Sequence, residues 1–281
     1  MTAEVLADDG VGVAAGRPVR TYLMCPPTHF AVTYAINPWM DPAVPVDRER
    51  ALGQWRELRA TYERLGHRVH TIEPVPGLPD MVFAANGGTV IGGRVLGARF
   101  RYPERAAEGV AYHDWFVRAG YRTVHRPEHV NEGEGDFAYH QGKIIAGYGF
   151  RTDRAAHDEL ARVFGLPVVP VELVDPRYYH LDTALCVVDA GTAMYLPEAF
   201  TAEGRRSLRE LFPDLIAASP EDAAVLGLNA VGDGLSVVLP REATGLAAAL
   251  AERGYRPVGV DIGELRRAGG GPKCCTLELR P

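Results

Sequence analysis

One cysteine of the chain has a setting that suits a nucleophile. Cys274 directly follows the glycine-rich run Gly269–Lys273 (GGGPK) near the end of the chain. A tight turn at the start of a strand can present a thiol to backbone N–H groups, which lower its pKa and favour the reactive thiolate. A free cysteine is as often a small buried hydrophobic residue. The residues alone leave both roles open for Cys274 and favour packing for Cys25, Cys186 and Cys275.

A cysteine nucleophile needs a partner that transfers protons, and His180 is the strongest candidate among the nine histidines. It lies in the segment DPRYYHLDTALCVV, two positions before Asp182. We expect a strand here, in which the side chains of His180 and Asp182 point to the same face. That arrangement would place a proton-transfer group beside a carboxylate. A half-buried histidine with an ordinary structural role is the alternative.

Charged side chains in turns indicate a charged ligand. Asp80 lies in LPDMVFAANGG, and Glu132 and Glu134 lie in NEGEGDFAYHQG. Carboxylates in apolar, glycine-rich turns favour a cationic ligand, although acidic residues also close turns for structural reasons. Arg105 and Arg151 stand at strand-to-helix junctions, where each could clamp a carboxylate or remain solvated. The sequence contains no P-loop, no HExxH and no zinc-spaced cysteine pair, so we expect neither cofactor nor metal.

The elements that must position these residues recur along the chain. Five helical patterns are each followed by a short strand, and the helices end at Gly66, Gly120, Gly165, Pro213 and Gly254. Glycine at a helix C-terminus adopts positive φ, whereas proline ends a helix because it lacks an N–H group. Glycine-bracketed hairpins precede the helices, which favours five repeats over a doubly wound sheet. We therefore expect a loose tail over residues 1–16 and one domain over residues 17–281.

Composition and charge exclude several classes of protein. Of the 281 residues, 47% are hydrophobic and 23% charged, so the chain can bury a sizeable core and is neither disordered nor fibrous. Its net charge of −6 argues against a nucleic-acid partner. The four cysteines and the absence of a signal-peptide pattern predict a cytoplasmic protein. The uncharged residues 21–40 contain three prolines and predict a buried strand and a structured loop, not a membrane span.

Several of these segments together resemble one superfamily. The segments FAANGG, RYPERAAE, EGEGD, GYGFRTD, YHLDT and GGGPKCCTL occur in an order and spacing similar to those of the guanidino-group-modifying (pentein, or amidinotransferase) enzymes. These include dimethylarginine dimethylaminohydrolases, arginine deiminases, arginine dihydrolase-type enzymes and glycine amidinotransferases. The resemblance covers nearly the whole chain. It implies an α/β fold, a five-bladed α/β propeller with pseudo-fivefold symmetry, in agreement with the five repeats.

The resemblance also implies roles for individual residues. Cys274 matches the nucleophile, His180 the general acid/base and Glu132 the acid of the EGxGD-like turn. The turn is one residue longer than the family's usual EGGD, which leaves Glu134 as the alternative acid. Arg105 and Arg151 match arginines that grip a substrate α-carboxylate. The implied substrate-binding residues are Asn37, Asp80, Phe83, Asn86, Arg105, Arg151 and Asp182, the last of which contacts the guanidinium.

One departure from the family pattern concerns the reaction. Deiminases and dimethylargininases have aspartate where this chain has Asn86. Together with the segment around Asn37, this residue looks more like the arginine dihydrolase-type branch, whose members release ornithine, carbon dioxide and ammonia. An asparagine removes one negative charge from the guanidinium site. The resemblance therefore leaves one hydrolytic step and two both open.

The implied activity is hydrolysis of the guanidinium group of arginine or N-methylated arginine through a covalent Cys274–amidino intermediate, with no cofactor. The alternatives are an amidinotransferase that uses the same thiol and an inactive binding protein on the same fold. The expected partner is a small-molecule guanidino substrate, with neither nucleic acid nor membrane. A homo-oligomer is compatible with the sequence.

Overall fold

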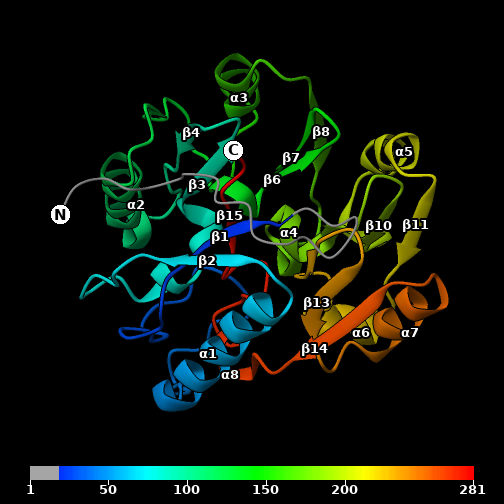
Figure 1. Cartoon of the computed structure of the whole chain (residues 1–281), viewed down its shortest axis with the longest axis horizontal. Helices are drawn as coiled ribbons and strands as arrows, with labels where there is room; N and C mark the ends of the chain where they lie inside the picture. The colour runs from blue at the N-terminus through cyan, green and yellow to red at the C-terminus, as the bar shows by residue number, and fades with distance from the viewer. Residues whose placement is uncertain (1–18) are drawn as a thin grey trace.

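The structure is a computed structural model and describes residues 19–281. Five three-stranded sheets are arranged as a ring, with one long helix on the outside of each (Figure 1). Each of these blades contains an antiparallel pair of strands and a third strand that is parallel to the middle one. The parallel strand is reached through the outer helix, because a parallel connection needs a long crossover. This arrangement confirms the predicted five-bladed α/β propeller.

Four blades follow one another along the chain. Their strands and outer helices are β3 (Gly88–Ile91), β4 (Arg94–Gly97), α2 (Ala106–Arg118) and β5 (Thr123–His125); β6 (Phe137–His140), β7 (Lys143–Tyr148), α3 (Ala156–Phe164) and β8 (Val168–Glu172); β9 (Leu185–Val187), β10 (Thr192–Tyr195), α5 (Ala202–Leu211) and β11 (Asp214–Ala217); β12 (Val231–Gly232), β13 (Ser236–Pro240), α7 (Thr244–Glu252) and β14 (Arg256–Val260).

The fifth blade joins the two ends of the described chain. It consists of β1 (Thr21–Met24), α1 (Arg48–Arg64), β2 (Arg68–Thr71) and the last strand, β15 (Leu277–Glu278). β15 pairs antiparallel with β1, and β1 pairs parallel with β2. The ring is therefore closed by hydrogen bonds between residues more than 250 positions apart, for example in the register Leu23↔Leu277. The predicted tail over residues 1–16 lies outside the described residues.

Short helices occupy the connections. They are the α-helices α4 (Leu181–Ala184), α6 (Pro220–Ala224) and α8 (Gly263–Arg266), and the 3-10 helices η1 (Pro79–Val82), η2 (Ala84–Gly87), η3 (Pro103–Arg105), η4 (Gly133–Gly135), η5 (Pro176–Tyr178) and η6 (Pro197–Ala199). Among them, α4 lies near the middle of the ring in Figure 1. η2 and η4 contact one another, and α4 contacts η4. These connections, not the outer helices, carry most of the predicted site residues.

The predicted helix ends are confirmed. The glycines at positions 66, 120, 165 and 254 all have positive φ, between 68° and 87°. Gly165 is the C-cap of α3 in the left-handed conformation, where a side chain with a Cβ atom would be strained. α5 ends at Leu211, two residues before Pro213. The residues 25–47 after β1 form no regular helix or strand, as expected for a structured loop.

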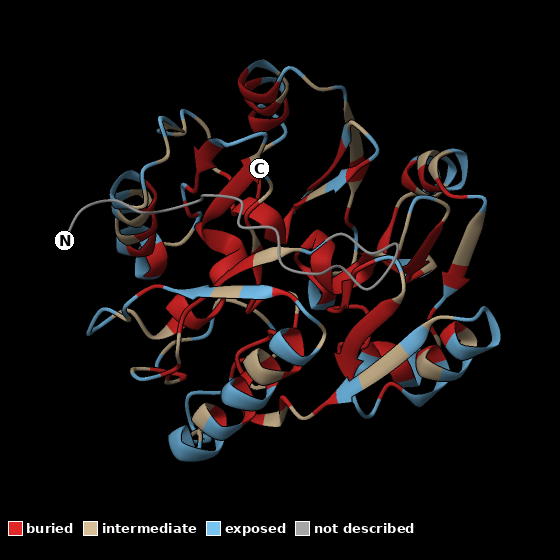
Figure 2. Cartoon of the chain, viewed as in Figure 1, coloured by how far each residue is buried: buried red, intermediate tan, exposed pale blue. Residues whose placement is uncertain are grey.

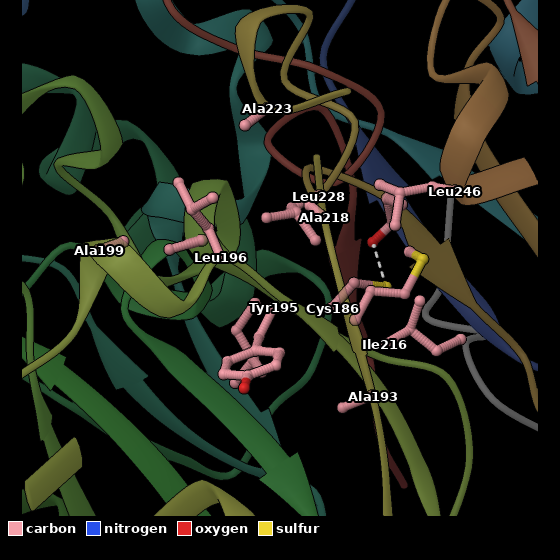
Figure 3. Close-up of a cluster of buried hydrophobic side chains, with 14 of the residues drawn as sticks. Cys186, Ala193, Tyr195, Leu196, Ala199, Ile216, Ala218, Ala223, Leu228 and Leu246 are labelled. Carbon is pink, nitrogen blue, oxygen red and sulfur yellow. Dashed lines mark hydrogen bonds between the residues drawn. The ribbon is translucent and has the colours of Figure 1, made fainter. Parts of the chain in front are cut away.

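The core follows the middle strand of each blade, which is β1, β4, β7, β10 or β13. Figure 2 shows that these strands are mostly buried, whereas the parallel edge strands and the outward faces of the long helices are partly exposed. The largest group of buried hydrophobic side chains spans the three blades that contain β7, β10 and β13. Figure 3 shows part of it, including Cys186, Leu228 and Leu246. None of the helices in the described residues is long and apolar enough to cross a membrane.

Candidate active site

Cys274 lies in a buried turn between α8 and β15. Only 2% of its surface is exposed. Its Sγ donates a hydrogen bond to Asp182 Oδ2 at 3.2 Å. Burial raises the pKa of the Cys274 thiol well above its ordinary value, and the adjacent Asp182 carboxylate raises it further. The sequence correctly places Cys274 in a tight turn, but the expected lowering of its pKa is wrong for the unliganded site.

His180 stands at the start of α4, not in a strand. It is the N-cap of this four-residue helix, and Asp182 is inside the helix. The expected strand is therefore wrong: residues two apart on a helix point in different directions. His180 Nε2 lies 2.9 Å from Glu132 Oε2, while Asp182 reaches Cys274. A carboxylate does stand beside the histidine, but Glu132 supplies it.

Glu132 connects the histidine to an arginine. The residue is fully buried, and its Oε2 also accepts a hydrogen bond from Arg151 Nη1 at 2.9 Å. Burial alone would raise the pKa of this carboxyl group. Arg151 and the hydrogen bond with His180 overcome that effect and hold the pKa of Glu132 well below its ordinary value. The carboxylate is therefore charged and lies in hydrogen-bond contact with the imidazole of His180.

Glu134 has a different set of partners. Its side chain accepts from Lys273 Nζ at 2.8 Å, from the backbone N–H of Glu278 at 3.0 Å and from Arg280. No hydrogen bond or ion pair in residues 19–281 joins it to His180. Of the two acids that the sequence left open, Glu132 is the one in contact with the histidine.

Asp182 combines burial with an unused acceptor. Burial raises the pKa of Asp182 to about 7, although the nearby Lys273 opposes the shift. Its Oδ2 atom accepts from Cys274, and its Oδ1 atom has no hydrogen-bond partner within the described part of the chain. His180 Nδ1 is also buried without such a partner there. Buried polar atoms are normally satisfied, so these two atoms are suited to a polar ligand.

The two predicted carboxylate-binding arginines are both held by residues of the chain. Arg105 is buried and pairs with Glu108 Oε2 at 2.8 Å, and its Nη1 donates to Asn86 Oδ1 at 2.9 Å. Arg151, besides its pair with Glu132, stacks on the ring of Tyr179 at 4.5 Å. The structure thus places both arginines at the site, where each balances a buried carboxylate.

The remaining predicted residues line the same region. Asn86 Nδ2 donates to the backbone carbonyl of Glu132 at 3.2 Å. Asn37 Nδ2 donates to the carbonyl of Ala268 at 3.0 Å and to Tyr179 Oη at 3.3 Å, which ties the 25–47 loop to the segment that leads into the Cys274 turn. Asp80 accepts from Tyr34 Oη at 2.9 Å. The ring of Phe83 fills the space where a Cβ atom of Gly270 would be, which accounts for one glycine of the GGGPK run.

Sequence reasoning missed four residues that contact the site: Tyr34, Glu108, Tyr179 and Asn229. Glu108 and Tyr179 lie inside segments that the resemblance already used, at i+3 from Arg105 and next to His180. Tyr34 also lies in a segment noted around Asn37. Asn229 lies in GLNAVGDG, which carries no motif, and only the three-dimensional arrangement brings it to Cys274.

A cavity of about 1080 Å³ approaches the turn that carries Cys274. Glu134, Asp182, Lys273 and Arg280 are among its lining residues, whereas Asn86, Arg105 and Arg151 are not. Asp182 therefore faces both Cys274 Sγ and this cavity. In the described residues, no group of three or more His, Cys, Asp or Glu side chains is arranged to hold a metal ion.

The chain is similar to several known proteins. The profile of the family described as "N,N dimethylarginine dimethylhydrolase, eukaryotic" matches residues 33–281. A protein of Mycobacterium tuberculosis named N(G),N(G)-dimethylarginine dimethylaminohydrolase is 54% identical over 283 residues, which cover 100% of this chain and 93% of that protein. The bifunctional arginine dihydrolase/ornithine cyclodeaminase ArgZ of Synechocystis is 36% identical over 92% of this chain, which spans 37% of that longer protein.

Solved structures show the same fold. The N-terminal domain of ArgZ bound to substrate superposes with a TM-score of 0.88 at 34% sequence identity, covering 93% of this chain and 98% of that domain. Dimethylarginine dimethylaminohydrolase from Pseudomonas aeruginosa, complexed with citrulline, has a TM-score of 0.79 at 19% identity and covers 92% of this chain and 99% of the other. The latter likeness concerns the fold alone.

Proposed function

Because this chain belongs to the dimethylarginine dimethylaminohydrolase family and is a hydrolase of the guanidino group of arginine or methylarginine, we propose that Cys274 is its nucleophile and His180 its general acid/base. One observation carries the proposal. The thiol and the imidazole are each paired with their own buried carboxylate, Asp182 at 3.2 Å and Glu132 at 2.9 Å. The thiol and the imidazole thus have separate carboxylate partners, which suits a thiol nucleophile that acts with a separate proton donor.

Substrate binding activates the nucleophile. The free Oδ1 atom of Asp182 can accept an N–H group of the substrate guanidinium. A bound cation beside Cys274 lowers the pKa of the thiol, which burial and Asp182 raise in the unliganded site. The thiolate then forms only when a guanidinium is present. A buried cysteine that is inert at rest is thereby converted into a nucleophile by its own substrate.

The reaction proceeds in two halves. The Cys274 thiolate attacks the guanidinium carbon, and His180 donates a proton to the departing amine as the C–N bond breaks. A planar S-linked amidino intermediate remains. His180 then removes a proton from water, the hydroxide adds to the same carbon, and the C–S bond breaks to release the thiolate. The charge of Glu132 supports the protonated imidazole that the first half needs.

Asn86 supports a second hydrolytic round on arginine. Its neutral amide lies between Arg105 and the backbone of Glu132, at the position where deiminases and dimethylargininases carry a charged aspartate. In one round arginine gives citrulline and ammonia. In two rounds arginine and two water molecules give ornithine, carbon dioxide and two molecules of ammonia. We infer that arginine is hydrolysed twice.

Product analysis with arginine and dimethylarginine side by side tests this proposal. From arginine, ornithine with two equivalents of ammonia supports two rounds, whereas citrulline with one equivalent of ammonia contradicts the second round. From dimethylarginine, citrulline with dimethylamine would show dimethylargininase activity. Transfer of the amidino group to an added amine would show a transferase instead. The Cys274→Ser variant is expected to lose activity, and full activity in this variant would overturn the role of Cys274.

The neighbouring thiol provides a matched control. Cys275 is fully buried one position later, and Cys275→Ser is expected to keep activity wherever it folds. A haloacetamidine should label Cys274 rapidly, with arginine blocking the reaction, whereas an inactive binding protein would show no such labelling.

All four cysteines are free, which supports a cytoplasmic location. Association into a homo-oligomer stays a prediction from the sequence.

A further inference from the structure

Asn229 has all of its side-chain polar groups directed at the nucleophile and its surroundings. The residue is fully buried just before β12. Its Oδ1 accepts a hydrogen bond from the backbone N–H of Cys274 at 2.9 Å. Its Nδ2 donates to the carbonyl oxygen of Asp182 at 3.0 Å and to Cys274 Sγ at 3.0 Å. One amide therefore contacts the nucleophile twice and the carboxylate-bearing helix once.

The orientation of this amide is fixed by the backbone groups around it. If oxygen and nitrogen exchanged places, the oxygen would face the Asp182 carbonyl and the nitrogen would face the Cys274 N–H. Both contacts would then be repulsive, because a carbonyl only accepts and a backbone N–H only donates. The N–H group of Asn229 must therefore point at Cys274 Sγ. The sulfur receives one hydrogen bond from Asn229 and donates one to Asp182.

The chain around the amide maintains this position. A Cβ atom on Gly271 would lie 2.8 Å from Asn229 Oδ1, so the glycine leaves room for the amide. The backbone N–H of Lys273 donates to the Asn229 carbonyl at 3.3 Å. The preceding residue, Leu228, is fully buried in the core cluster of Figure 3. The donor is thus held on the rigid core and not on a mobile loop.

We propose that Asn229 is a further catalytic residue, whose amide N–H stabilises the Cys274 sulfur as a thiolate. A hydrogen bond to the charged form of an acid favours that form. Asp182 acts in the opposite direction while it accepts the thiol proton. Asn229 is a neutral side chain that supports the anion without competing for the substrate cation. The proposal rests on the proposed function, because it assigns Asn229 to the step in which the thiolate forms and to the step in which it is released.

The test measures the thiol directly. The rate of Cys274 alkylation by 2-chloroacetamidine is followed between pH 5 and pH 10 in the wild type and in two variants. Asn229→Asp keeps an oxygen for the Cys274 N–H and removes the donor to the sulfur. It also adds a negative charge beside the thiol, so the uncharged Asn229→Ser variant isolates the loss of the donor. Asn229→Ser is smaller and uncharged, and its short side chain gives up the same donor. Each variant is first checked by circular dichroism and thermal unfolding.

A matched control lies in the same blade. Ser236 is buried, and its hydroxyl has no hydrogen-bond partner in the described residues. Ser236→Ala therefore perturbs the packing near β12 without touching Cys274, and its alkylation profile should equal that of the wild type.

We expect the apparent pKa of alkylation to rise by about one pH unit or more in Asn229→Asp and in Asn229→Ser, which slows alkylation about tenfold at neutral pH. A folded variant whose profile equals the wild-type profile would overturn the proposal, even if its melting temperature had fallen. Asn229→Ser decides the matter if Asn229→Asp does not fold. Because alkylation reads the thiol and not turnover, a failure of the proposed function appears separately, as absent products in the wild type.

Discussion

Glu132 and Glu134 lie two residues apart in one turn and are equally buried, yet they have different neighbours. Glu132 contacts His180 and Arg151. Glu134 contacts Lys273, Arg280 and the backbone of β15. Both carboxyl groups have lowered pKa values, because the neighbouring cations outweigh the effect of burial.

The partners of a buried acid, rather than its burial or its pKa, therefore decide what it can do. Glu132 is paired with a histidine, the side chain that most often transfers protons in catalysis. Glu134 is paired with two permanent cations next to the strand that closes the ring. We therefore propose that Glu132 takes part in proton transfer and that Glu134 supports the closure of the propeller.

Removing the charge of Glu132 should have the largest effect. We expect Glu132→Gln to lower kcat/KM by about 10³-fold, because the amide no longer favours the protonated form of His180. Steady-state kinetics on the substrate that the wild type hydrolyses measures the effect. The same change at Glu134 is the matched control, and it should lower kcat/KM by less than about tenfold when assayed where the variant is folded. Equal losses in the two variants would remove the distinction.

The second prediction concerns stability, for which Glu134 should matter more than Glu132. Glu134→Gln leaves Lys273 and Arg280 without their shared carboxylate, and both cations keep about a fifth of their side-chain surface exposed. Breaking a fully buried pair costs about 3–5 kcal/mol, so we expect about 2–3 kcal/mol here. Urea unfolding measures the free energy of unfolding. An unchanged midpoint and slope in Glu134→Gln would show that this ion cluster does not support ring closure.

The sequence predicts the ring better than it predicts the site. Helix–glycine–strand junctions repeat locally, and each junction needs only nearby residues to form. The residues Gly66, Gly120, Gly165 and Gly254 could therefore be identified one by one. The motifs also identify Cys274, His180 and Glu132, which the structure gathers from distant segments.

What the sequence could not resolve are the pairings across blades. The choice between Glu132 and Glu134 depends on which side of a single turn each side chain faces. Asn229 has no motif, and its contact with Cys274 joins residues 45 positions apart. The spacing of His180 and Asp182 fits a strand, but the chain forms α4 there, which sends the two side chains to different partners. Such contacts are set by tertiary packing and leave no local periodicity.

Asp182 is a third buried acid, and within residues 19–281 it forms no ion pair with a cation. Burial raises the pKa of Asp182 to about 7, whereas Glu132 and Glu134 are held charged far below that pH. A raised carboxyl pKa means that the folded protein binds the proton more tightly than the unfolded chain. The lowered pKa values of Glu132 and Glu134 have the opposite effect: their ionisation stabilises the fold above about pH 4.5, and this contribution is lost as the pH falls. The ionisation of Asp182 destabilises the unliganded fold progressively from about pH 4 to pH 7.

The smallest predicted effect follows from this difference and concerns binding. A guanidinium that binds the Asp182 carboxylate must displace its proton below pH 7. Arginine should therefore bind the Cys274→Ser variant about tenfold more weakly at pH 6 than at pH 8, as measured by titration calorimetry. The same comparison in Cys274→Ser with Asp182→Asn should show weak binding that is nearly independent of pH in this range. If the pH dependence persisted without Asp182, another group would control it, and because Glu132 and Glu134 remain charged throughout this range, neither of them could be that group.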